Sequence, residues 1–92
     1  MNYSQIVQEL EQVASQLDLQ IRHEKGDFEG GYCILKEQKV LVVNKKLVES
    51  RKAAALALAL AEYGVESIYL KPAIRTFIED ETAKAGRGRK RK

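Results

Sequence analysis

Residues 32–43 read YCILKEQKVLVV, two apolar runs on either side of a short polar and charged stretch. β-Branched and aromatic residues are favoured in strands, so Tyr32–Leu35 and Val40–Val43 predict a β-hairpin. The stretch between them lacks the Gly or Asn that a two-residue turn prefers, and we therefore expect a longer or bulged connection. Because Val40–Val43 is apolar on both faces, it indicates a central strand, covered on both sides or by a partner.

The residues before the hairpin predict a helix and a further strand. Apolar residues recur at three- and four-residue spacing over positions 4–17, and Asn2 or Ser4 is a suitable N-cap, which is typical of an amphipathic helix. From Leu19 to Glu24 apolar and polar residues alternate, as in a strand with one buried face. The following glycine-rich stretch, 24–31, is interpreted as a strand connection with a glycine bulge, and a binding loop is the alternative.

The residues after the hairpin predict two helices. Residues 51–63 are rich in alanine and leucine, and this composition favours a helix that is covered on most sides. Ser50 is the expected N-cap and Gly64 the residue that ends this helix. Pro72 fits the first position of a last helix, which we expect to reach about residue 84.

Together the patterns predict a single α+β domain over residues 1–85. It consists of an N-terminal helix, a three-stranded mainly antiparallel sheet and two C-terminal helices. Residues 86–92, GRGRKRK, have two helix-breaking glycines and almost nothing to bury, so a disordered basic tail is expected.

Positive charge is concentrated in that tail. The whole chain has a net charge of +3, but residues 1–85 hold 11 basic and 13 acidic residues, a net charge of −2. The remaining five basic residues are Arg87, Arg89, Lys90, Arg91 and Lys92.

Three motifs resemble a small bacterial protein family that has no assigned activity. The motifs form a GGxC…VVNK…IYLxPAxR pattern and occur here at Gly30–Cys33, Val40–Lys45 and Ile68–Arg75. This resemblance implies a shared fold and no particular chemistry. The hairpin is also distantly similar to the core of zinc-dependent peptidases, whose helix carries H-E-x-x-H. Residues 58–62 read LALAE instead, so we expect no metal site and no cofactor.

Cys33 and His23 are the side chains best suited to covalent or acid–base chemistry. They would form a thiolate–imidazolium pair if the first two strands were neighbours. The alternative is that Cys33 is a small buried packing residue and that His23, in phase with Leu19 and Ile21, is structural or partly buried. No third orienting residue can be placed, and the sequence therefore favours a non-enzymatic protein over an enzyme.

Four polar residues at the ends of apolar elements are candidate contacts to a ligand or partner. The guanidinium of one of them, Arg75, can hold a carboxylate of an acidic ligand, or it can pair with Glu79 four residues on. The four candidates are Asn44, Arg51, Tyr69 and Arg75.

The function predicted from these observations is a small interaction or binding module that forms a homodimer or binds a protein partner, because so short a chain buries limited apolar surface. The alternative is an accessory nucleic-acid-binding protein whose tail contacts phosphates weakly and nonspecifically. Residues 1–12 lack the features of a signal peptide, the apolar run 53–61 is about half the length of a membrane span, and there is one cysteine. We therefore expect a cytoplasmic protein with no membrane contact.

Overall fold

A computed structural model describes the chain over residues 2–27, 30–35 and 37–88, with the side chains at 32–35, 87 and 88 excepted. The elements follow the predicted order of a helix, three strands and two helices, which confirms the α+β class. In chain order they are α1 (Tyr3–Gln16), β1 (Gln20–Glu24), β2 (Gly30–Leu35), β3 (Gln38–Asn44), α2 (Glu49–Tyr63) and α3 (Pro72–Gly88).

The strands form one sheet in the order β1-β3-β2. β2 and β3 pair as the predicted antiparallel hairpin, with Leu35 opposite Gln38, so that two residues connect them. The expectation of a longer connection is wrong, because Glu37 adopts a left-handed φ of 70° and thereby closes a tight turn. β3 is the central strand, as its two apolar faces predict.

β1 pairs with β3 in parallel, from Gln20 opposite Val40 to Glu24 opposite Asn44. The predicted mainly antiparallel sheet is therefore corrected to a mixed sheet, with one parallel and one antiparallel pair among the described strands. The reason is burial. Because β3 is apolar on both faces and occupies the centre, the chain that leaves β1 has to pass β3 and place β2 at the opposite edge.

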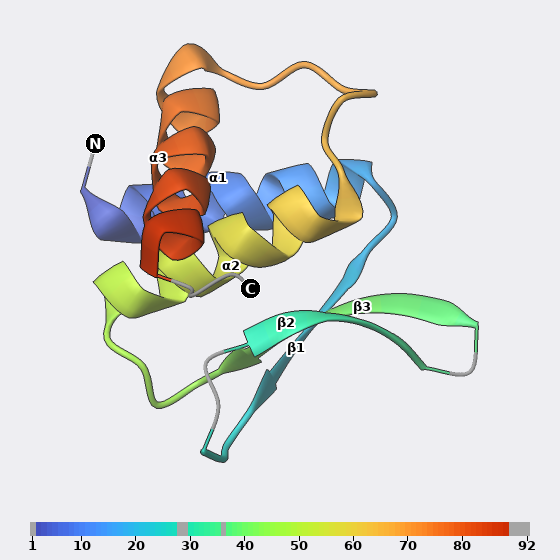
Figure 1. The fold of residues 1–92 in the computed structure, drawn as a ribbon. Coiled ribbons are helices and arrows are strands. Elements are labelled where there is room, and N and C mark those ends of the chain that lie inside the picture. The colour runs from blue at the N-terminus through green and yellow to red at the C-terminus, as the bar shows by residue number, and fades with distance from the viewer. Residues whose placement is uncertain (1, 28–29, 36, 89–92) are drawn as a thin grey trace.

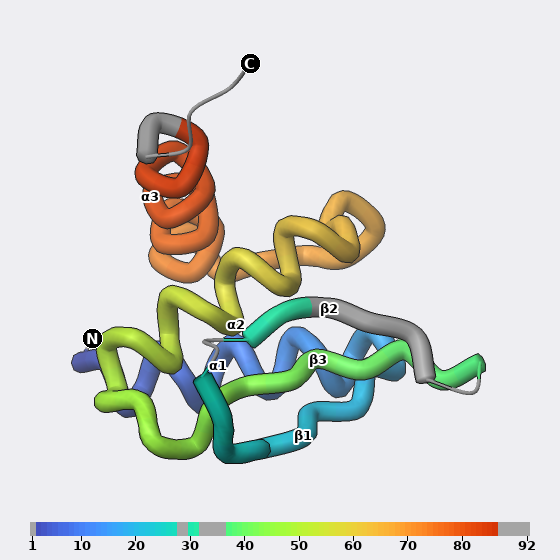
Figure 2. The backbone as a smooth tube through the Cα atoms, turned by 60° about the horizontal axis from the view of Figure 1, so that its bottom comes forward, coloured from blue at the N-terminus to red at the C-terminus, as the bar shows by residue number. Residues whose placement is uncertain are grey.

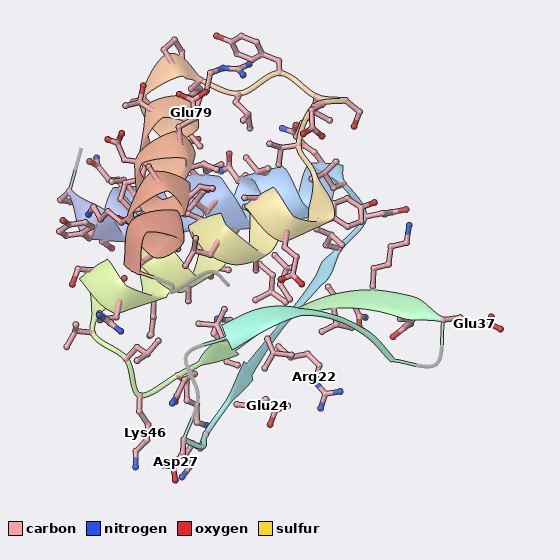
Figure 3. All side chains as sticks on the ribbon, in the orientation of Figure 1. Arg22, Glu24, Asp27, Glu37, Lys46 and Glu79 are labelled. Carbon is pink, nitrogen blue, oxygen red and sulfur yellow. The ribbon has the colours of Figure 1, made fainter. Side chains whose placement is uncertain are left out.

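The three helices lie on one side of the sheet (Figure 1). α1 and α2 pack on each other and against the strands, whereas α3 packs on α2 and α1 within the described part of the chain. Figure 2, turned to bring the underside forward, shows β1 and β3 in front of α1. Arg22 and Glu24 project from β1 on the side without helices, joined by a 2.9 Å ion pair (Figure 3).

α2 forms the centre of the hydrophobic core. Its Leu56 and Leu60 are fully buried, as are Leu10 of α1, Leu41 of β3 and Ile74 of α3. Most alanines of α2 are buried as well, which lets the neighbouring elements approach closely. The prediction that this helix is covered on most sides is confirmed. Among the described residues, no helix has the length and apolar character that a membrane span needs.

The helix ends agree with the predicted caps at two of three positions. Asn2 caps α1, because the Gln5 N–H donates to its Oδ1 at 2.8 Å and its own N–H donates to Gln5 Oε1 at 3.1 Å. Gly64 ends α2 with a φ of 106°. The prediction that Ser50 is the N-cap of α2 is wrong, because the helical hydrogen bonds already begin at the carbonyl of Val48.

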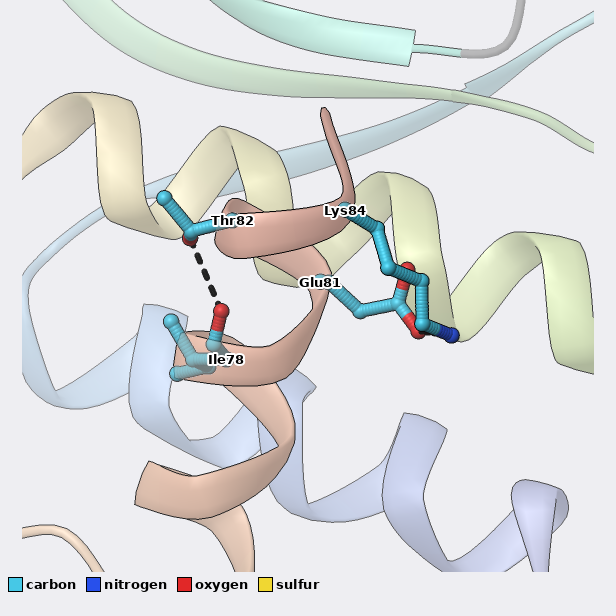
Figure 4. A network of polar contacts seen from close by, with 4 residues as sticks. All are labelled: Ile78, Glu81, Thr82 and Lys84. Carbon is cyan, nitrogen blue, oxygen red and sulfur yellow. Dashed lines mark hydrogen bonds and ion pairs between the residues drawn. The ribbon is translucent and has the colours of Figure 1, made fainter. Parts of the chain in front are cut away.

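α3 continues further than predicted, through Gly86 to Gly88. A glycine inside a helix costs only about 1 kcal/mol relative to alanine, which the surrounding turns can offset. One of these turns contains a 3.2 Å ion pair between Lys84 and Glu81 (Figure 4). The predicted disordered tail is therefore corrected over residues 86–88, and residues 89–92 lie outside the described part of the chain.

Candidate functional site

A hollow on the described surface lies between β2, α2 and α3, and we call it the α2 groove. Its volume is about 510 Å³. Gly30 and Gly31 of β2 form one side, and the last turns of α3, from Thr82 to Gly86, form the other. The floor is one face of α2, made of Ala55, Leu58, Ala59, Ala61 and Glu62. Apart from Leu58 and Glu62, the residues that line the groove are small, and most of them are apolar.

The groove runs beside an edge of the sheet on which no further strand pairs among the described residues. β2 is hydrogen-bonded to β3 on one side and ends the sheet on the other. A Cβ on Gly30 would collide with the carbonyl oxygen of Val42, so glycine is required at this position, whereas a Cβ on Gly31 would meet nothing within 4 Å. The backbone at the start of β2 is therefore not shielded by side chains of its own.

Glu62 is the one charged residue among the described residues that line the groove. Its side chain is exposed and takes part in no hydrogen bond or ion pair within the described part of the chain. The other polar side chain, that of Thr82, is already used, because its hydroxyl donates to the Ile78 carbonyl at 2.8 Å (Figure 4). The groove thus offers a single unpaired carboxylate to an occupant.

A second hollow, of about 420 Å³, lies at the hairpin end of the sheet. Asp18 and Glu37, which both have positive φ, line it together with Lys39 and Tyr63. The Lys39 ammonium lies 5.3 Å from the centroid of the Tyr63 ring, in the range of a cation–π contact. This hollow therefore already contains a cation beside its two carboxylates.

Asn44 and Arg51, two of the four candidate contacts, belong to the segment that joins β3 to α2. Asn44 is only 6% exposed. Its Nδ2 donates to the Gly26 carbonyl at 2.7 Å, and its Oδ1 accepts from the Lys46 N–H at 3.0 Å. The amide therefore fastens the loop after β1 to the end of β3. Arg51 is exposed in the first turn of α2.

The other two candidates, Tyr69 and Arg75, lie around the start of α3, at the top of the view in Figure 1, whereas α2 begins lower in that view. Tyr69 is 74% exposed and borders a small hollow of about 120 Å³. Arg75 is exposed, and the described residues contain no ion pair between it and Glu79. The four predicted contacts thus do not converge on one site.

Cys33 and His23 lie on strands that are separated by β3. Cys33 is in register with Val40 and His23 with Val43, so their backbones are about 10 Å apart across the strands and about 10 Å along them. The condition for a reactive pair, adjacent strands, is not met. His23 is exposed instead, with Nε2 3.7 Å from a carboxylate oxygen of Glu11.

No group of three or more metal-ligating side chains occurs in the part of the chain that the structure describes. Of the basic tail, Arg87 lies in the last turn of α3, and Arg89, Lys90, Arg91 and Lys92 fall outside the described residues.

The α2 groove was not predicted from the sequence. The one signal for it was Glu62, the first charge after a long apolar helical run.

Comparison with known proteins leaves the fold and the groove as the basis for any functional conclusion. No family model, curated protein or solved structure matches the chain. The resemblances to a bacterial family and to the peptidase core therefore stay predictions.

Proposed function

We propose that this protein is a non-enzymatic, cytoplasmic interaction module that forms a homodimer by pairing β2 of one copy with β2 of a second copy. The observation that carries the proposal is the free edge of β2 beside the α2 groove. An unpaired strand edge presents N–H and C=O groups that readily pair with another strand.

The contrast between the two edges of the sheet supports the choice of β2. The other edge strand, β1, reads QIRHE and carries Arg22, His23 and Glu24. Charged residues are the usual protection of an edge strand against pairing. β2 reads GGYCIL, with no charge and no proline. Two such strands pair in antiparallel orientation without placing like charges opposite each other, as a two-fold dimer requires.

The position of the possible catalytic residues supports a non-enzymatic role. Cys33 and His23 are two strands apart, and the Thr82 hydroxyl in the α2 groove is engaged by its own helix. Nucleophilic catalysis requires the nucleophile and its base within hydrogen-bonding distance.

The test is the mass of the protein in solution over a dilution series, by light scattering or sedimentation equilibrium. We expect a dimer that dissociates on dilution. Gly31→Lys adds a charge to the β2 edge at a position with open space, and it should weaken the dimer about tenfold while the circular dichroism spectrum stays unchanged.

Thr76→Lys is the matched control, because it adds the same charge to an exposed position of α3 away from the groove. It should dimerise like the parent chain. A protein that stays monomeric at every concentration would contradict the proposal, and so would a Gly31→Lys variant that dimerises normally.

A second candidate function is nucleic-acid association through the tail. It is favoured by the separation of charge, with a net −2 over residues 1–85 and five basic residues between Arg87 and Lys92. Contacts to phosphates of this kind are strongly salt-dependent and nearly independent of sequence.

Truncation of the tail tests this candidate. Because α3 extends to Gly88, a chain that ends there keeps the helix and loses four charges. Its retention on immobilised DNA or RNA at low salt should largely disappear, and the slope of log affinity against log salt should fall by about 3–4. Unchanged retention would exclude the tail as the cause.

A further inference from the structure

A separate hollow lies between the start of α1 and the middle of α3, and we call it the α1–α3 hollow. Its volume is about 350 Å³, within the range of small-molecule sites. Two aromatic residues, two carboxylates, an alanine and a lysine line it among the described residues: Tyr3, Phe77, Asp80, Glu81, Ala83 and Lys84. None of these residues lines the α2 groove, so the two hollows are distinct.

Two aromatic rings line this hollow together. The ring centroids of Tyr3 and Phe77 are 6.4 Å apart and the ring planes form an angle of 67°, which is a favourable edge-to-face arrangement. Tyr3 is 49% exposed, so part of its ring surface remains open to a ligand. Because the face of an aromatic ring carries negative potential, it attracts cations.

Carboxylates lie on the same side of α3 as the aromatic ring of that helix. Asp80 and Glu81 follow Phe77 by three and four residues, a spacing that places all three on one helix face. Asp80 is exposed and takes part in no hydrogen bond or ion pair within the described part of the chain. The hollow therefore combines ring surface with negative charge, and both favour a positively charged ligand.

One of the two carboxylates already accepts a cation. The Lys84 Nζ lies 3.2 Å from Oε2 of Glu81, one turn along the same helix (Figure 4). The Lys84 side chain is 63% exposed, and an exposed ion pair at this spacing contributes little to stability. A competing cation can therefore displace the Lys84 ammonium.

We propose that the α1–α3 hollow binds an alkylammonium or guanidinium group, with the positive charge beside Asp80 and Glu81 and the aliphatic stem on the aromatic rings. The Lys84 ammonium competes for Glu81 and so lowers the affinity. A free polyamine and a basic side chain of a protein partner both present this chemistry. The site is independent of β2 pairing, because no residue that lines it belongs to β2.

Titration of isotope-labelled protein with n-butylammonium tests the site. At low salt, the NMR signals of the Phe77 ring and of the Asp80 and Glu81 amides should shift and reach saturation. n-Butanol has the same aliphatic stem without the charge, and as the matched control ligand it should cause much smaller shifts. Equal shifts with both ligands, or no shifts with either, would overturn the proposal.

Two matched pairs of variants locate the bound cation. Tyr3→Leu and Tyr69→Leu each remove an exposed ring, but Tyr69 lies outside the hollow. Asp80→Asn and Glu79→Gln each neutralise an exposed carboxylate of α3, but Glu79 lies outside it (Figure 3). Tyr3→Leu and Asp80→Asn should weaken binding about two- to fivefold, the range of one exposed cation–π contact or ion pair. The controls should bind like the parent, and an equal loss within either pair would refute the site.

Lys84→Met should change the affinity in the opposite direction. It keeps the apolar part of the side chain and removes the ammonium that competes for Glu81. n-Butylammonium should therefore bind about two- to fivefold more tightly, and weaker binding would contradict the proposal.

Two larger ligands distinguish the possible sources of the cation. Spermidine represents a free polyamine, and a blocked tripeptide with a central arginine represents a protein side chain. The ligand that binds more tightly identifies the source. Gly31→Lys, which disturbs the β2 edge, should bind both ligands like the parent chain, so failure of the dimer and failure of this site are separate results.

Discussion

At the scale of single residues, Gly30 shows how closely α2 approaches the sheet. A Cβ at this position would collide with the Val42 carbonyl oxygen and lie 3.4 Å from the Cβ of Ala55. Gly30→Ala should therefore lower the free energy of unfolding by about 1–3 kcal/mol in urea denaturation. Gly31→Ala, with open space around it, should stay within about 0.5 kcal/mol. Equal effects of the two substitutions would contradict the packing described for Gly30.

Asn44 gives a second prediction at this scale. Its buried amide satisfies the Gly26 carbonyl and the Lys46 N–H. Asn44→Ala leaves both backbone groups without this partner, so the free energy of unfolding should fall by about 1–3 kcal/mol. Gln38→Ala, at an exposed position of the same strand, is the control and should have little effect. A neutral Asn44→Ala would mean that solvent replaces the amide.

At the scale of elements, Gly86 lies within α3 rather than after it, and this position makes a prediction with a definite sign. Gly86→Ala should stabilise the helix by about 0.5–1 kcal/mol, because a Cβ there meets nothing within 4 Å and alanine loses less entropy. The same substitution at Gly64, where φ is 106°, should destabilise the protein. Thermal unfolding of both variants checks the pair, and a destabilising Gly86→Ala would contradict the helical assignment.

Most elements were predictable from local patterns, and their arrangement was not. Periodicity in α1, the paired apolar runs of β2 and β3, and the alanine-rich α2 all depend on neighbours in the sequence. The parallel pairing of β1 with β3 depends instead on which strand competes best for the centre of the sheet. The end of α3 was predicted too early, because Gly86 disfavours a helix. The free-energy cost of a glycine is smaller than the stabilisation that the neighbouring helical turns supply.

At the scale of the whole molecule, the candidate site is made by residues that carry no common motif. The α2 groove joins β2, α2 and the end of α3, segments that are far apart in the sequence. The predicted contacts Asn44 and Tyr69 were chosen because polar residues at element ends are often functional, but the fold places them apart. Charge separation between domain and tail, in contrast, was fully visible in the sequence.

The parallel pairing of β1 also has a kinetic consequence. Leu35 and Gln38 are three positions apart in the chain, whereas Gln20 and Val40 are twenty apart, so the hairpin closes a much shorter loop than the parallel ladder does. We expect the hairpin to form in the folding transition state and β1 to join it afterwards. In stopped-flow experiments Val43→Ala should therefore slow folding, with a φ-value of about 0.5–0.8, and Ile21→Ala should mainly speed unfolding, with a φ-value of about 0–0.3. β1, the strand that we expect to join the sheet last, carries Arg22, His23 and Glu24. These charged side chains protect it from pairing with other chains before it joins β3.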